Sequence, residues 1–470
     1  MTTPVTSSPS AASPPADRRR WAILAVVLFA SVLDLLDATI TNIAAPSIAA
    51  DLGGGEALVQ WLGASYALAM GVLLVVGGRL GDRYGRRRLF LVGITGFTVA
   101  SVACGLAFDP ASAVVFRLAQ GAFGALLIPQ GFGILGAVFP RDEIGRAFGV
   151  FAPALGLSAV GGPVLAGFLI DADVLDLGWR AMFLINIVLG GLAIALAVRL
   201  LPRDGGDRTV GIDALGAALL AAAMLGLLHG LIDGSAHGWT ALPVGCLALG
   251  AVFLALFGLR QRTAAAPLIE PSLLANRGFT SGLVLGLVFY AAVSGLLLVL
   301  SLYLQNDLRR TPARTALGLT PVAVGIIIAS VAAHRFIARL GRRLVLIGLL
   351  LTLTGVLGAL AAVETAPGSW LLSLPVLVTG LGMGTCFGTV YDVTLGDVDP
   401  AGSGSASGSL SAVQQLANSI GAAAVTTVYF HTGGVAPSLA VVAALTFACC
   451  GLVRLMPRAA RAHHGEGGPP

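Results

Sequence analysis

The sequence contains no lysine, so all 28 residues in its combined lysine and arginine count are arginines. A Walker A phosphate-binding loop ends in Gly-Lys-Ser/Thr, and a Schiff-base enzyme needs a lysine amine, so both classes are excluded. The H-E-x-x-H motif of zinc peptidases and the G-x-S-x-G motif of serine hydrolases are also missing. We therefore expect neither a P-loop ATPase nor another enzyme, and no cofactor.

Charged residues are scarce as well: they make up 11% of the 470 residues, against about a quarter in soluble domains, while 56% are apolar. This composition predicts a polytopic protein with the lipid bilayer as its partner. The net charge of +5 does not indicate nucleic acid, because the arginines lie between apolar runs, where lipid head groups and orientation account for them. We expect no nucleic-acid partner.

Cysteine is rare, and its five copies all lie inside apolar runs without a C-x-x-C pair. Such cysteines are usually buried apolar residues, so we expect neither a disulfide nor a metal site. They are Cys104, Cys246, Cys386, Cys449 and Cys450.

Long apolar runs are abundant, and each can cross a bilayer as a helix. Residues 1–20, rich in Ser, Pro and Ala, predict a disordered cytosolic tail, and the run from Trp21 is too long for a cleaved signal peptide. Hydropathy predicts fourteen membrane-spanning helices, at residues 21–46, 59–79, 88–108, 112–138, 147–170, 180–200, 212–232, 239–259, 279–304, 316–337, 343–363, 370–392, 405–430 and 435–456.

The distribution of arginines predicts the orientation of these helices. Loops on the side of the N-terminus hold most arginines, whereas loops on the other side are mostly acidic, as at Asp51 and Glu56. This positive-inside pattern predicts a multi-pass protein of the inner (plasma) membrane with both termini cytosolic. One loop, with Arg309, Arg310 and Arg314, dissents, but the reversed topology would create many more violations.

An internal repeat divides the chain. A shift of 256 residues lays residues 335–343 on 79–87 with five identities in nine positions, although Ala338 replaces Asp82. We interpret this as a duplication of two unequal halves, an architecture found among transporters. The predicted parts are an N-terminal six-helix bundle (21–202), a two-helix central insert with linkers (203–276), a C-terminal six-helix bundle (277–457) and a cytosolic tail (458–470).

The densest charge in the chain lies in residues 78–88, GRLGDRYGRRR, between two apolar runs. The stretch resembles the signature turn between helices two and three of the major facilitator superfamily. We expect Asp82 to pair with a helix of the other half as a gate, while the arginines set the topology. The resemblance assigns this cytosolic gate motif to Gly78, Asp82, Arg83, Gly85, Arg86 and Arg87.

Three further stretches resemble the fourteen-helix drug:proton antiporters of that superfamily. They are residues 36–46 (LDATITNIAAP) in helix one, 117–125 (RLAQGAFGA) in helix four and 162–167 (GPVLAG) in helix five. With further family-like stretches at 179–186 and 302–305, the resemblance spans most of the chain. It implies an all-α polytopic major facilitator fold with fourteen helices, and a monomer that exchanges protons for small molecules by alternating access, with the proton as coupling ion.

Two acidic residues in the first predicted helix are candidates for proton binding. Asp34 and Asp37 lie three residues apart, on one helix face. A charged carboxylate near the bilayer centre costs about 2.5 to 3.5 kcal/mol on insertion scales, so it is rare unless it has a function. Arg117 in the fourth helix is the natural counter-charge, and the resemblance favours Asp37 as the carrier. The alternatives are a polar pair bonded to a neighbouring helix and a static ion pair.

Gly162, Pro163 and Gly167 in the fifth predicted helix permit flexing and close helix approach. The resemblance assigns these residues to antiport rather than symport. The alternative is that they are ordinary residues of a membrane helix.

Polar and aromatic side chains within apolar helices are candidates for a substrate cavity, namely Asn42, Gln120, Tyr290, Gln414, Gln415 and Asn418. The ninth to eleventh predicted helices contain no Asp or Glu, which makes the cavity less suited to divalent cationic drugs. The leading hypothesis is a proton-coupled exporter of small amphipathic, drug-like or antibiotic-like molecules. The alternatives are a proton-coupled exporter or importer of a dedicated metabolite and, more remotely, a membrane-embedded enzyme or sensor.

Overall fold

The computed structural model describes residues 17–140, 161–173, 176–269, 271–365, 370–395 and 403–456, with the isolated positions 143, 150, 158 and 398. These residues are mostly helical and contain no β-strand. Twelve of the described helices are long and apolar enough to cross a membrane. The predicted all-α polytopic fold is confirmed.

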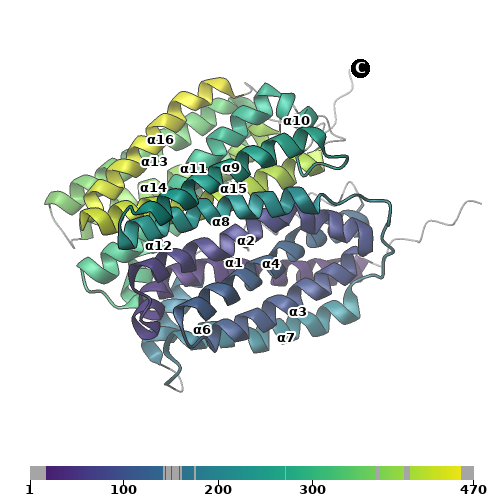
Figure 1. The fold of residues 1–470 in the computed structure, drawn as a ribbon, viewed down its shortest axis with the longest axis horizontal. Coiled ribbons are helices and arrows are strands. Elements are labelled where there is room, and N and C mark those ends of the chain that lie inside the picture. Colours follow the sequence, from purple (N-terminus) through teal and green to yellow (C-terminus); the bar gives the residue numbers. More distant parts are fainter. Residues whose placement is uncertain are drawn as a thin grey trace, which may run out of the picture.

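The N-terminal half starts with four long helices and ends with a shorter pair (Figure 1). α4 shows how the sequence sets a helix start. The Asp109 carboxylate accepts the Ser112 amide at 2.6 Å, the Ser112 hydroxyl accepts the Asp109 amide at 3.2 Å, and Pro110 fills the first helical position. The described helices of this half are α1 (Asp17–Leu52), α2 (Gly55–Tyr84), α3 (Arg86–Gly105), α4 (Pro110–Val138), the helix Gly161–Ala172, α6 (Ala181–Leu184) and α7 (Asn186–Leu200).

The C-terminal half repeats this order after two inserted helices. The insert is α8 (Ala214–His237) and α9 (Ala241–Thr263), followed by the short α10 (Pro271–Ala275). The half itself consists of α11 (Arg277–Leu302), α12 (Pro312–Leu340), α13 (Arg342–Thr365), α14 (Ser373–Thr394), α15 (Ser403–Thr432) and α16 (Val435–Leu452). The shift of 256 residues also relates the turns, since Gly85 separates α2 from α3 and Gly341 separates α12 from α13.

The predicted total of fourteen helices is matched in part. The predicted helix at 405–430 coincides with α15, which is rich in Ser, Gly, Gln and Asn and is absent from the twelve apolar spans. α15 packs against α2, α8 and α11, so much of its surface faces protein rather than lipid. Of the predicted helix at 147–170, the structure describes the apolar segment Gly161–Ala172 and two isolated positions. The total of fourteen therefore stays a prediction.

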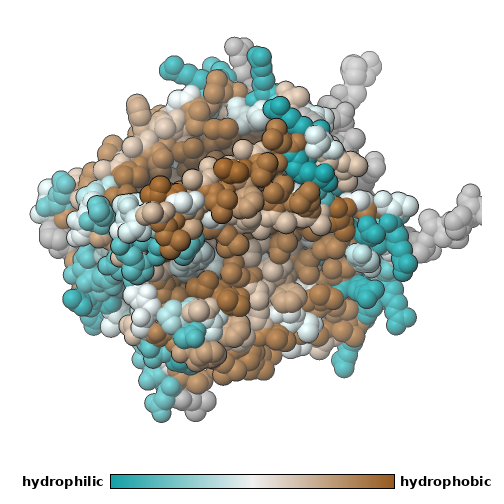
Figure 2. Space-filling model, viewed as in Figure 1, coloured by the Kyte–Doolittle hydropathy of each residue, from teal (hydrophilic) through white to brown (hydrophobic). Residues whose placement is uncertain are grey.

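The surface has the hydropathy expected of a membrane protein. Apolar side chains cover the middle of the visible face, and hydrophilic side chains gather at the two ends of the helices (Figure 2). A spanning segment must satisfy its backbone hydrogen bonds internally, which the α-helix does within one segment.

The insert covers the boundary between the two halves. α8 packs against α2 of the N-terminal half and α15 of the C-terminal half, and α9 packs on α8 (Figure 1). Apolar residues of all four helices form one buried cluster, which includes Val72, Leu228, Phe257 and Leu416. The insert therefore lies where the halves would move against each other.

Hydrogen bonds join the halves at the end opposite the Gly85 turn. The Ser301 hydroxyl donates to the Asn42 carbonyl at 3.0 Å, and the Ser419 hydroxyl donates to the Ala64 carbonyl at 2.8 Å. Gln305 Nε2 likewise donates to the carbonyl next to Asn42 at 3.1 Å. We call this contact of α1 with α11 and of α2 with α15 the seam.

Candidate functional site

The two acidic residues of α1 are buried inside the N-terminal half. Asp34 is 5% exposed and Asp37 is 3% exposed, one helical turn apart. The helix that carries them contacts α2, α4 and α7, so both carboxyls face protein groups. The predicted shared helix face is confirmed.

Asp37 forms a buried ion pair with Arg117 of α4. Arg117 Nη1 donates to Asp37 Oδ2, and Gln120 Nε2 donates to Asp37 Oδ1 at 2.8 Å. Arg117 Nη1 also donates to Gln120 Oε1 at 2.7 Å, so three side chains close one network. Both carboxylate oxygens have a donor, as a buried charge pair requires if its desolvation is to be offset.

Asp34 has a different partner, Tyr66 of α2, whose hydroxyl donates to Asp34 Oδ1. The tyrosine ring also supports the arginine, because Arg117 Cζ lies 4.5 Å from its centroid, within the range of a cation–π contact. A side chain at Gly124 would come within 2.9 Å of both the Asp34 carboxylate and the Tyr66 hydroxyl. The glycine of α4 thus makes room for this bond.

Glycines of the fifth predicted helix lie in two tight contacts. A Cβ atom added at Gly162 would lie 2.2 Å from Thr39 Oγ1 of α1, and one added at Gly167 would lie 2.6 Å from Ala313 Cα of α12. The segment therefore touches both halves where only a glycine fits. This contact is what the sequence predicted for these residues; their role in antiport stays a prediction, as does that of Pro163.

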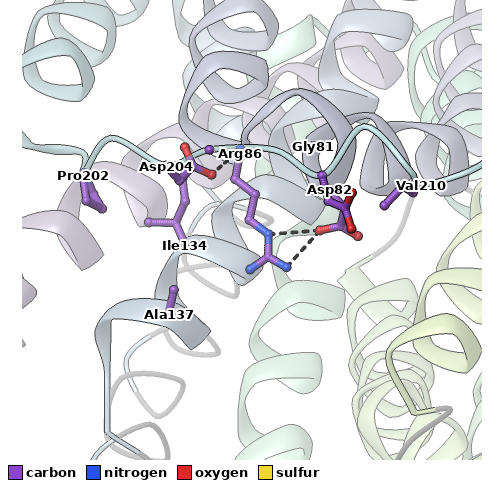
Figure 3. A pocket seen from close by; sticks show the side chains of 10 residues that line it. Gly81, Asp82, Arg86, Ile134, Ala137, Pro202, Asp204 and Val210 are labelled. Carbon is purple, nitrogen blue, oxygen red and sulfur yellow. Dashed lines mark hydrogen bonds and ion pairs between the residues drawn. The ribbon is translucent and has the colours of Figure 1, made fainter. Parts of the chain in front are cut away.

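The turn at residues 78–88, called the arginine turn, joins α2 to α3 and also contacts the linker that leads to the insert (Figure 3). Gly85 adopts a φ of +96° between α2 and α3, a conformation that other residues rarely adopt. Asp204 of the linker accepts the backbone amides of Arg86 at 2.5 Å and Arg87 at 3.1 Å, and so caps α3. A pocket of about 390 Å³ lies between this cap and Asp82.

Asp82 pairs within its own turn. Its Oδ1 accepts Arg86 Nη2 at 2.9 Å and Arg86 Nε at 3.2 Å, and its backbone carbonyl accepts the Asp207 amide of the linker at 2.8 Å. Arg83 Nη1 donates to the Val210 carbonyl of the same linker at 3.1 Å. In this structure the two halves bond to each other at the opposite end, through the seam. Asp82 instead bonds its own turn and the linker, and its expected pairing with the other half stays a prediction.

Two acids outside the membrane-spanning segments have lowered pKa values. Hydrogen bonds from the hydroxyl and amide of Thr209 hold the pKa of Asp207 below its ordinary value of 3.8, and the Ser112 amide and hydroxyl do the same for the pKa of Asp109. Both groups are therefore ionised throughout the range from about pH 5 to pH 8. A change of transport with pH in that range has its origin elsewhere.

A family profile described as Major Facilitator Superfamily matches residues 27–422. The chain belongs to the Major Facilitator Superfamily. A probable actinorhodin transporter of Streptomyces coelicolor is 44% identical over 90% of this chain and 74% of its own length. The puromycin resistance protein of Streptomyces alboniger is 35% identical, with 92% and 86% covered. The tetracenomycin C resistance and export protein of Streptomyces glaucescens is 33% identical, with 86% and 75% covered.

Solved structures agree on the fold of this major facilitator protein. A peptide transporter in complex with sulfate superposes with a TM-score of 0.68 at 17% identity, covering 92% of this chain and 95% of that one. The E. coli xylose transporter gives a TM-score of 0.65 at 15% identity, with 93% and 98% covered. The family identifies the chain as a transporter in a multi-pass membrane fold, not an enzyme.

The predicted cavity residues of this major facilitator protein separate into several environments. Gln120 is fully buried in the ion network with Asp37, and the Asn42 carbonyl belongs to the seam. In the C-terminal half, Tyr290 is buried and stacks on Phe387 with centroids 5.9 Å apart and rings inclined by 6°. The roles of these residues in a cavity stay predictions.

The three amides of α15 differ in their contacts. Gln414 Oε1 accepts the Tyr391 hydroxyl at 2.7 Å inside the C-terminal half. Gln415 lies near the boundary between the halves, because its Cβ is 3.1 Å from a Cβ added at Gly71 of α2. Asn418 Nδ2 donates to Gln415 Oε1 at 3.4 Å. The three side chains therefore do not form one cluster.

Sequence reasoning missed two side chains that complete the sites. Tyr66 is a hydroxyl-bearing aromatic residue in a mostly apolar run, but this signal does not reveal its partners, which lie on α1 and α4. Asp204 lies in the linker between the bundles and carries no local signal, because its role depends on how the linker folds back on α3. Among the described residues, no group of three His, Cys, Asp or Glu side chains could hold a metal ion.

Proposed function

We propose that the chain exports small amphipathic, antibiotic-like molecules in exchange for protons, as a monomer working by alternating access. One observation carries the proposal: a pair of carboxyls and an arginine are buried within the membrane-spanning helices of the N-terminal half. Ionisable groups are rare in such a place unless they serve transport. The proton is proposed to bind at the pair Asp34 and Asp37, with Arg117 as counter-charge.

The names of the relatives support the substrate class. They refer to actinorhodin, tetracenomycin C and puromycin, three different molecules handled by proteins similar over most of this chain. Export driven by protons needs no ATP. One proton moving through about 100 mV yields about 2.3 kcal/mol, and a tenfold gradient requires about 1.4, so one proton supports a gradient of about fifty-fold.

Everted membrane vesicles test this proposal. Vesicles containing the protein are energised, and actinorhodin, tetracenomycin C, puromycin or ethidium is added while the proton gradient is followed. We expect at least one compound to collapse part of the gradient, and the double variant Asp34→Asn with Asp37→Asn to abolish that response. Asp51→Asn is the matched control, because Asp51 lies on the same helix but pairs with Arg180 at the exposed end of α1.

Two results would contradict the proposal. A response that persists in the double variant would move the proton site away from α1. A wild-type protein that responds to none of the compounds would favour a dedicated metabolite as the substrate.

A further inference from the structure

The two carboxyls of α1 differ in their partners although both are buried. Asp37 has an arginine on one oxygen and an amide on the other, so its charge is balanced. Asp34 has the Tyr66 hydroxyl on one oxygen, and this donor is neutral. A buried charge needs a paired cation and a filled hydrogen-bond set, and Asp37 alone has both. Of the two, Asp34 is therefore the one suited to gain and lose a proton.

Tyr66 touches both parts of this arrangement. Its hydroxyl donates to Asp34, and its ring lies against the guanidinium that balances Asp37. The tyrosine is 3% exposed, so both contacts are shielded from water. A single side chain thus contacts both the carboxyl of Asp34 and the ion pair of Asp37 with Arg117.

Tyr66 also belongs to the helix that forms the seam with the other half. The Ala64 carbonyl, two residues before it, accepts the Ser419 hydroxyl of α15 at 2.8 Å. A Cβ added at Gly71, five residues after it, would lie 3.0 Å from Leu416 of α15. The part of α2 that carries Tyr66 is therefore in direct contact with α15.

We propose that Tyr66 is the positioning residue of the proton site, with its hydroxyl aligned on Asp34 as the proton carrier and its ring against Arg117 of the permanent ion pair. This inference deepens the proposed function and rests on it for its role in transport. It differs from the family resemblance, which favours Asp37 as the carrier. Among the residues that the structure describes, the titratable or charged groups that face this site are Asp34 and Asp37 from α1, Tyr66 from α2, Cys104 from α3 and Arg117 from α4.

Infrared difference spectroscopy of the full-length protein in lipid membranes tests the inference without any substrate, because the proton is the probe. We expect the carbonyl band of a buried neutral carboxyl to titrate with pH and to be lost in Asp34→Asn. In Tyr66→Phe the band should remain, change in frequency, and titrate about one pH unit higher. The hydroxyl stabilises the ionised form, and a hydrogen bond contributes about as much free energy as one pH unit.

Tyr429→Phe is the matched control. The Tyr429 hydroxyl donates to the Asp307 carboxylate at 2.8 Å, so this variant loses the same kind of bond within the C-terminal half. We expect the titration of the band to be unchanged in Tyr429→Phe. A band that survives Asp34→Asn, or a wild-type titration midpoint in Tyr66→Phe, would overturn the inference.

Transport separates this inference from the proposed function. In vesicles, Tyr66→Phe should move the pH of half-maximal transport upward while the KM for the transported compound changes less than about twofold, since the ring and the ion pair stay. If the infrared result holds but the wild type shows no substrate-driven proton movement, the proposed function fails and the site assignment stands.

Discussion

The two halves have the same order of helices but bury different polar groups. In the described C-terminal half, every buried polar side chain other than tyrosine is a serine or threonine hydroxyl, whereas the N-terminal half buries two aspartates, an arginine and several amides. The shift of 256 residues that relates the halves lays Asp34 on Tyr290 and Tyr66 on Val322. The position of the buried Asp34 in one half is therefore held by a neutral aromatic residue in the other, and that of Tyr66 by an aliphatic one.

The difference between the halves bears on where proton binding and substrate binding can take place. A hydroxyl in a membrane helix satisfies itself on its own backbone, as Thr352 does on the Gly348 carbonyl at 2.9 Å. Aspartate and arginine have no such local solution and need partners from other helices. The N-terminal half is thus the half whose stability depends on charge pairing, and we propose that the substrate contacts the neutral C-terminal half.

Breaking the ion pair should produce the largest effect. Asp37→Asn leaves Arg117 as an uncompensated buried charge, which typically costs about 3 to 5 kcal/mol. We expect a clear loss of thermal stability in detergent, measured by the unfolding temperature. Asp34→Asn is the matched control one turn away, and it should cost much less because the hydrogen-bond donor to Asp34 is the neutral Tyr66 hydroxyl and Arg117 keeps its pair with Asp37. Equal losses in the two variants would contradict the assignment of different roles to the two acids.

Much of this contrast could be predicted from the sequence, but not its geometry. The helices, the arginine turn and the pairing of Asp37 with Arg117 follow from hydropathy, motif and the need of a buried charge for a partner. The bonds of Gln120 in the ion network depend on how α4 is rotated against α1, and its expected role in a cavity stays a prediction. Tyr66 could not be assigned for the same reason, since its partners come from two other helices.

Removing an aromatic pair from the C-terminal half should weaken substrate binding and leave proton binding unchanged. Phe387→Leu keeps an apolar side chain but loses the stack on Tyr290, and aromatic pairs contribute about 0.5 to 1.5 kcal/mol. We expect the KM for the transported compound to rise up to about tenfold, with an unchanged pH profile of transport. Phe447→Leu on the exposed face of α16 is the control and should change neither. A shifted pH profile in Phe387→Leu would end the proposed separation of tasks.

The related turns at Gly85 and Gly341 also differ in their polar contacts, with a smaller expected effect on stability. The first turn is capped by the Asp204 carboxylate, whereas Arg342 at the second turn donates to the Arg454 and Met456 carbonyls. Asp204→Ala should cost about 1 kcal/mol, as the loss of a helix cap does. We expect faster hydrogen exchange at the Arg86 and Arg87 amides and slower transport.

Asp207→Ala is the control for this turn. The Asp207 carboxylate bonds the Thr209 of its own loop, and its backbone amide bond to Asp82 survives the substitution. Exchange at the first turn of α3 should therefore stay at the wild-type rate. An Asp207→Ala protein that exchanges as fast as Asp204→Ala would show that the linker as a whole, and not the cap, holds the turn.

The smallest effect is expected at Gln60 of α2, where the shift of 256 residues gives Ala316 in the C-terminal half. Gln60 is 1% exposed, and within the described part of the chain neither of its amide atoms has a hydrogen-bond partner. Replacing an unsatisfied buried amide by an apolar group of similar size is nearly neutral or stabilising, so Gln60→Leu should keep or slightly raise the unfolding temperature. Gln130→Leu is the matched control: its Nε2 donates to the Gly77 carbonyl at 2.7 Å, and its loss should be destabilising by about 1 to 3 kcal/mol. If Gln60→Leu is as destabilising as Gln130→Leu, then Gln60 has a partner that stabilises the fold, and the N-terminal half contains one more polar contact without an equivalent in the C-terminal half.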